Sequence, residues 1–178
     1  KLPPPTGNAG EAKDNYTYGN YRAALSEYLA FLEKDPKNPN YLYKAGMCYL
    51  NGNVDFPRAV KNLQMAIDAG VQEKDVFFQL ARAQHLVYQF DEAIKNYEKG
   101  TELAKNKDLE IRARRNIEMC NNAKILMKNP VNVTIVNLGP EVNSAEPDYY
   151  PFVDDGETFL LFTTRRAKGN IGYLTDDG

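Results

Sequence analysis

An alanine recurs along the first two thirds of the chain at intervals of 35 and then 34 residues. The three positions are Ala24, Ala59 and Ala93, and an aromatic residue stands three positions before each of them. A large side chain follows four positions after each alanine. Self-similarity at a period of about 20 to 50 residues indicates stacked units that share one continuous core.

A further helix is predicted before each of these stretches, with a small residue near its centre. Ala12, Gly46 and Ala81 occupy equivalent places in these first helices. Small residues in both helices of a pair let the two backbones approach closely, and the large side chains then fill the space between pairs. The sequence therefore predicts three helix pairs.

This arrangement resembles the tetratricopeptide repeat over roughly residues 8–105. Residues 107–128 add one helix with an apolar stripe at spacings of four and three and a polar opposite face, suited to sealing the last core layer. The stripe comprises Leu109, Ala113, Ile117, Cys120, Ala123 and Met127. We predict an all-α fold over residues 8–128, a tetratricopeptide-repeat superhelix of three helix pairs plus a capping helix.

The resemblance implies a concave face, lined by the first helix of each pair, that holds an extended peptide or a partner helix. Aromatic residues and cations are the side chains that favour binding hot spots. By repeat position, the groove residues are Lys13, Tyr16, Tyr43, Met47, Leu50, Phe78, Arg82 and His85. An alternative stays open for each of them, which is packing against a neighbouring helix.

One subset of the family grips the C-terminal carboxylate of chaperones with basic and asparagine side chains. Here Asp75 and Gln79 stand where the third repeat of that subset supplies cations. Asp75 would repel a carboxylate. The sequence therefore argues against a chaperone-tail adaptor.

Composition and motifs disfavour several other classes of protein. The net charge of -2 does not fit a nucleic-acid partner, and no apolar run approaches the roughly 18 residues that a membrane span needs. His85 is the sole histidine, and Cys48 and Cys120 have no metal-ligand spacing. We expect no enzyme, no cofactor and no metal. The Pro-rich start, KLPPPTG, is typical of a linker.

After Pro130 the pattern changes to that of strands. Residues 131–139 alternate apolar and polar side chains, and residues 143–166 predict two strands around a turn. The acidic pair Asp154 and Asp155 could suggest a carboxylate dyad or a calcium site. We prefer a turn, because Asp155-Gly156 is a strong hairpin signal and glycine adopts the positive φ of a tight turn. A Gly169-Asn170 turn and a strand at 171–175 are predicted to follow.

The stretch at residues 137–166 also carries a second resemblance, to outer-membrane-associated proteins of gliding and oral Gram-negative bacteria. In these proteins tetratricopeptide repeats lead into a WD-like β-propeller, often followed by an OmpA-like peptidoglycan-binding domain. The matching residues are Asn137 to Gly139, Asn143, Ser144, Asp148, Tyr149, Pro151, Asp155, Gly156, Thr163, Arg165 and Arg166. The resemblance implies that residues 129–178 are a linker and the first blade fragment of a truncated propeller.

Taken together, these resemblances imply a non-enzymatic protein-protein interaction scaffold. It would be periplasmic, associated with the outer membrane through other parts of the protein, and linked to peptidoglycan or to the type IX secretion and gliding machinery. The alternative is a free-standing cytoplasmic adaptor that binds a peptide in its concave groove. In that alternative, residues 131–178 fold back onto the helices as a cap.

Overall fold

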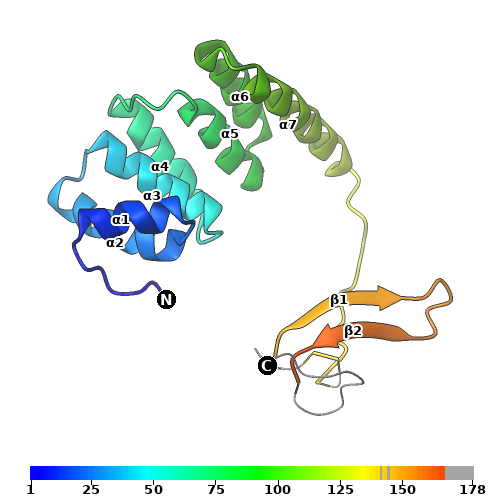
Figure 1. Cartoon of the computed structure of the whole chain (residues 1–178). Helices are drawn as coiled ribbons and strands as arrows, with labels where there is room; N and C mark the ends of the chain where they lie inside the picture. The colour runs from blue at the N-terminus through cyan, green and yellow to red at the C-terminus, as the bar shows by residue number, and fades with distance from the viewer. Residues whose placement is uncertain (141, 144, 167–178) are drawn as a thin grey trace. The chain divides into compact units, whose positions relative to one another are not determined.

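The computed structural model describes residues 1–140, 142–143 and 145–166, and the chain divides into two units. We call Lys1–Pro130 the helical unit and Val131–Gly178 the C-terminal unit. The helical unit holds α1 (Ala9–Thr17), α2 (Tyr21–Lys34), α3 (Pro39–Asn51), α4 (Phe56–Asp68), α5 (Val76–Leu86), α6 (Phe90–Ala104) and α7 (Lys107–Leu126). Consecutive helices pack as neighbours, so that the predicted three pairs and the additional last helix are confirmed (Figure 1).

Short polar side chains fix where several of these helices begin. Asn8 caps α1 by accepting from the backbone N–H of Gly10 and Glu11, and Asn38 and Asn106 cap α3 and α7 in the same way. These bonds satisfy donors that have no partner within the helix. The capping residues thereby define the entry of the chain into α1, α3 and α7.

The repeated small residues lie where helices meet. Ala24, Ala59 and Ala93 are completely buried, as the 34- to 35-residue period predicts. The buried side chains form two clusters, a larger one that runs from α1 to α5 and a second one among α5, α6 and α7. Helix α5 contributes to both, with Leu80 in the first cluster and Phe78 in the second.

Two helical glycines mark the closest approaches between helices. A Cβ added at Gly46 would lie 2.8 Å from Cγ of Leu63 on α4. A Cβ added at Gly100 would lie 2.9 Å from the backbone nitrogen of Phe78 on α5. A larger residue at either site would therefore push two helices apart.

The first seven residues, which we call the N-terminal strap, pack along α2 rather than forming the predicted linker. The Glu27 carboxylate, 3% exposed, accepts from Thr6 N at 2.5 Å, Thr6 Oγ1 at 2.9 Å and Gly7 N at 2.8 Å. The Ser26 hydroxyl donates to the Pro3 carbonyl at 2.5 Å, and Leu2 packs against the larger cluster.

Helix α7 is one helix, as predicted, and buries Ala113 and Cys120 against the second cluster. The prediction of a polar opposite face was wrong. Ile111 and Met119 are 58% and 48% exposed, and Met127, which we placed on the apolar stripe, is 57% exposed. Met127 follows the last helical residue and is therefore outside the packed stripe.

The C-terminal unit contains the predicted hairpin, in which β1 (Asp148–Val153) pairs with antiparallel β2 (Leu160–Thr164). Tyr149 pairs with Thr163 but Phe152 with Leu161, so that one additional residue bulges from β1. Tyr150 has φ 50° there, and Pro151 has no N–H to give to a ladder.

The remaining secondary-structure predictions for residues 131–178 are either wrong or lie outside the described residues. The predicted strand at 131–139 is wrong, because these residues have no regular structure and pair with no strand among the described residues. An alternating pattern gives a strand only where a neighbour completes the hydrogen bonds. Ser144, the turn at 169–170 and the strand at 171–175 lie outside the described residues.

Replacing Gly100 by alanine should lower the free energy of unfolding by about 1 to 3 kcal/mol, because the new methyl group meets backbone of α5 that no side-chain rotation can move. The helix preference of alanine, about 1 kcal/mol, would act in the opposite direction. Urea unfolding followed by circular dichroism measures the change. Glu98→Ala, at an exposed site on α6, is the control and should change stability by less than about 0.5 kcal/mol. An unchanged or higher stability of Gly100→Ala would contradict this close approach.

Replacing Glu27 by glutamine should destabilise the helical unit by about 1 to 3 kcal/mol at neutral pH, since an amide presents a donor to groups that are themselves donors. Burial alone would raise the pKa of Glu27, but the bonds from Thr6 and Gly7 outweigh it and hold the pKa below its ordinary value. The carboxylate therefore contributes stability above the unfolded-state pKa, and this contribution is lost as the pH falls through the folded-state pKa. Unfolding from pH 7 down to about pH 3 should show the difference between the two proteins shrinking. If the stability difference between the wild-type protein and Glu27→Gln did not depend on pH, the ionised carboxylate could not be its source.

Candidate functional site

The eight residues predicted for the groove divide into two groups in the structure. Four are buried in helix packing, namely Tyr43, Met47, Leu50 and Phe78, each at most 6% exposed. Tyr16, Arg82 and His85 are half-buried, and Lys13 is exposed. The alternative of packing therefore describes the first group, and a partner role of the second group stays a prediction.

Phe78 illustrates why the packing alternative applies. Its ring lies 5.3 Å from the ring of Tyr97, edge to face, and its backbone touches the site of Gly100. A fully buried aromatic of this kind stabilises the α5–α6 pair through its area and its ring geometry. Its side chain offers no surface to a ligand.

A continuous row of contacts crosses from α1 to α3 to α5. Lys44 Nζ lies 4.0 Å above the ring of Tyr16 and 5.6 Å from the ring centre of Tyr43. The Tyr43 hydroxyl donates to Asp75 Oδ1 at 3.0 Å. Gln79 Nε2 donates to Asp75 Oδ2 at 2.7 Å, and Arg82 Nη1 donates to Gln79 Oε1 at 2.6 Å. We call Tyr16, Tyr43, Lys44, Asp75, Gln79 and Arg82 the polar row.

Asp75 is the centre of the polar row and remains an acceptor there. Burial raises the pKa of Tyr43, and the charge of Asp75 together with the hydrogen bond raises it further. The Tyr43 hydroxyl consequently stays protonated and keeps donating to the carboxylate. Asp75 therefore does not cap α5, although it stands at the N-terminal end of that helix.

Arg112 brings a cation from α7 to the same helix, α5, where its guanidinium carbon lies 5.0 Å from the ring centre of Phe78. Burial raises the pKa of Tyr97, and the nearby charges of Arg82 and Arg112 oppose this shift. Both guanidinium groups are thus within electrostatic reach of the same hydroxyl. The polar row and Arg112 together connect α1, α3, α5 and α7.

Sequence reasoning missed Lys44 and Arg112. Lys44 stands two residues before Gly46, which is the place of Gln79 relative to Ala81, so the repeat alignment could have identified it. Arg112 has no such signal. We assigned its helix only a capping role, and its contact with Phe78 depends on how α7 packs on α5.

A cavity of about 610 Å³ adjoins the middle of the polar row, at Tyr43 and Asp75. It lies between the α4–α5 connection and the α6–α7 connection. The lining residues are Tyr43, Gln72, Glu73, Lys74, Asp75, Ala104, Asn106 and Leu109. With two acidic residues and one lysine in its lining, this cavity offers a negatively charged surface beside the middle of the row.

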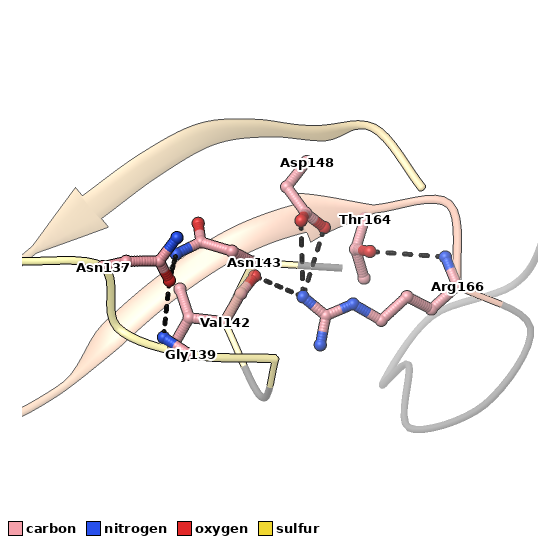
Figure 2. Close-up of polar contacts among 7 residues, drawn as sticks. All are labelled: Asn137, Gly139, Val142, Asn143, Asp148, Thr164 and Arg166. Carbon is pink, nitrogen blue, oxygen red and sulfur yellow. Dashed lines mark hydrogen bonds and ion pairs between the residues drawn. The ribbon is translucent and has the colours of Figure 1, made fainter. Parts of the chain in front are cut away.

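In the C-terminal unit, residues of the second resemblance hold one another (Figure 2). Asn137 Oδ1 accepts from Gly139 N at 2.8 Å and Asn143 Nδ2 at 2.9 Å. Arg166 Nη2 donates to the Val142 carbonyl and lies 3.4 Å from both carboxylate oxygens of Asp148. These contacts connect the loop before β1 to the end of β2 and describe a structural role for the motif.

The hairpin turn is also held by its own acidic residue. Asp154 Oδ1 accepts from the backbone N–H groups of Thr158 at 2.7 Å and Phe159 at 3.0 Å. The Phe159 N–H and the Thr158 hydroxyl hold the pKa of Asp154 below its ordinary value. The turn interpretation is confirmed, but the assignment of positive φ to Gly156 was wrong, because Glu157 adopts φ 53° in this longer connection.

The described residues contain no group of three His, Cys, Asp or Glu side chains that could hold a metal ion. Burial raises the pKa of Cys48 to about 12, so its thiol stays protonated. Within the same residues, none of the helices has both the length and the apolarity to cross a membrane.

His85 should titrate below the ordinary histidine pKa, because burial lowers its pKa. Its imidazole lies 5.7 Å from the ring of Phe90, edge to face, on α5 and α6. The imidazole is therefore neutral at pH 7 and adds no charge to the polar row. A pH titration of the one histidine signal by heteronuclear NMR measures this value, and the urea-unfolded protein is the control. An equal His85 pKa in the folded and the urea-unfolded protein would contradict the burial of His85.

Comparison with known proteins identifies solved structures with a similar fold. No protein-family model matches the chain, and no curated protein matches it. Among solved structures, the chain is similar to the first TPR of Spaghetti (RPAP3) bound to an HSP90 peptide, with 20% identity and a TM-score of 0.56 over 66% of this chain and 90% of that chain.

Two further structures extend this similarity. The Yersinia enterocolitica type III secretion chaperone SycD in complex with a peptide of the translocator YopD has 19% identity and a TM-score of 0.56 over 65% of this chain and 90% of that chain. The Sgt2 TPR domain from Aspergillus fumigatus has 20% identity and a TM-score of 0.52 over 78% of this chain and 99% of that chain. The helical unit therefore has the tetratricopeptide-repeat fold.

Proposed function

We propose that the helical unit is a protein-interaction scaffold that binds an extended segment of a partner along the polar row. The observation that carries this proposal is the row itself. Its polar and charged groups come from successive first helices, contact one another from α1 to α5, and adjoin a cavity. Hydrogen-bonding side chains held in place by neighbours lower the ordering cost of binding a flexible segment.

The similar structures support the same function. Two of them, the RPAP3 repeat and SycD, are described in complex with peptides. Because their identity to this chain is only 19 to 20%, the peptides themselves do not transfer. What this chain binds depends on its own side chains along the row.

Photo-crosslinking in cells tests the scaffold without assuming the chemistry of the partner. A photoreactive amino acid at Lys13 or Arg82 should give adducts of one and the same partner, because both positions lie along the first helices. Lys61 on α4 and Lys99 on α6, both exposed, are the controls and should give no such adduct. Equal crosslinking from all four positions, or different partners at Lys13 and Arg82, would contradict a shared binding face.

We further propose that the protein is periplasmic and associated with the outer membrane, as part of a longer chain with a β-propeller. Two observations on the C-terminal unit support this. The motif residues form the contact set around Arg166 and Asn137. The hairpin leaves apolar side chains exposed on both faces, because Phe152 is 57% exposed and its neighbour Val153, which points to the opposite face, is 50% exposed. A two-stranded sheet needs further strands to bury such groups.

Cell fractionation distinguishes this proposal from the adaptor alternative. An antibody against the helical unit should detect a band well above the 20.1 kDa of this sequence, in the outer-membrane fraction. A band near 20.1 kDa in the cytoplasm would instead favour the free-standing adaptor. An inner-membrane marker and a cytoplasmic enzyme are the fractionation controls.

A further inference from the structure

The first helices and α7 each present one cation near the polar row. Lys13 and Arg82 directly follow the small residues Ala12 and Ala81, so they hold equivalent places in α1 and α5. Lys44, on α3, stands three residues before Met47, the corresponding place there, and residues three apart share a helix face. Arg112 joins this series from α7 through its contact with Phe78.

These four cations, which we call the cation series, have no acidic partner among the described residues. No carboxylate oxygen within residues 1–140, 142–143 and 145–166 lies within 4.0 Å of Lys13, Lys44, Arg82 or Arg112. Within the described part of the helical unit, ion pairs are formed by Arg58, Arg114 and Lys124, the last with Asp91 at 2.5 Å, and none of these cations lies along the polar row. The charge of the series is therefore left for something outside the described residues.

Neutral groups hold three of the four cations in position. The ring of Tyr16 supports Lys44, the ring of Phe78 supports Arg112, and the Gln79 carbonyl oxygen accepts from Arg82. Aromatic rings and amides orient a cation without neutralising it. The cations are thus positioned in advance and keep their full charge.

Asp75 is the acidic residue that interrupts the series, and its two oxygens already accept from Tyr43 and Gln79. It stands with Glu73 in the lining of the adjoining cavity. A free terminal carboxylate entering that cavity would be repelled by both residues. Acidic side chains that lie over Lys44, Arg82 and Arg112 would not need to enter it.

We propose that the cation series binds an extended, internal partner segment with acidic side chains at alternate positions. This inference rests on the proposed scaffold function and specifies the chemistry of its partner. Alternate residues of an extended chain point to the same side, so one series of carboxylates faces the protein. Recognition uses these side chains and does not need the end of the partner chain.

Fluorescence anisotropy with the full chain tests this at low salt. The probe is a labelled peptide of about twelve residues in which Glu alternates with Ser, acetylated and amidated at its ends, and it spans about 40 Å when extended. The same peptide with Gln in place of Glu should bind at least about tenfold more weakly, since charge complementarity is lost. A version with a free C-terminal carboxylate should bind no more tightly than the amidated one. Affinity for the Glu peptide should fall as salt is added.

Substitutions locate the site on the protein. Lys44→Met and Arg82→Gln should each weaken binding of the Glu peptide about threefold, the size expected for one partly exposed charge pair. Lys99→Met is the matched control, because Lys99 also lies over a ring, 4.1 Å from the centre of Phe77, but on the second helix of its pair. It should leave the affinity unchanged. Circular dichroism checks that each variant is folded.

Three outcomes would overturn the inference. Equal binding of the Glu and Gln peptides would show that charge is not recognised, while leaving the scaffold function intact. Equal weakening by Lys99→Met would assign the binding to general electrostatics. Binding of the free-acid peptide alone, or of neither peptide up to roughly 1 mM, would show that internal acidic segments are not ligands.

Discussion

The close approach of paired helices is the constraint on which the helical unit depends. It requires a residue without a long side chain wherever two helix backbones meet, and the chain supplies one at a period of 34 to 35 residues. Once the backbones are close, large side chains can fill only the remaining gaps. Tyr97 and Leu63 are accordingly buried. At Gly100, the facing backbone of Phe78 leaves no room for a methyl group.

The first and the last segment of the helical unit are attached to it by different means. Helix α7 packs on α6 at one end. At the other end an extended strap is held by hydrogen bonds to the side chains of Glu27 and Ser26. An extended segment has no helix to satisfy its backbone groups, so buried polar side chains must do so.

The repeat made the fold predictable from sequence, because spacing alone identifies which residues meet. What escaped prediction depends on contacts between distant residues. Glu27 has the pattern of an ordinary charged helix residue, and only the seated strap explains its burial. Tyr43 and Phe78 have the composition of binding anchors, yet the helices use them for packing. Lys44, which lies near the ring of Tyr43, and Arg112, which lies near the ring of Phe78, belong to the cation series. Residue type alone did not predict either of them as a binding residue.

The bulge in β1 has a consequence for how the hairpin can grow. Tyr150 and Pro151 disrupt the regular spacing of donors along β1, and Pro151 contributes no donor at all. The outer edge of β1 is therefore a poor template for another strand, whereas β2 carries no proline. Additional strands would be added beside β2 alone, which gives the sheet a single direction of extension and protects its other edge from adventitious aggregation.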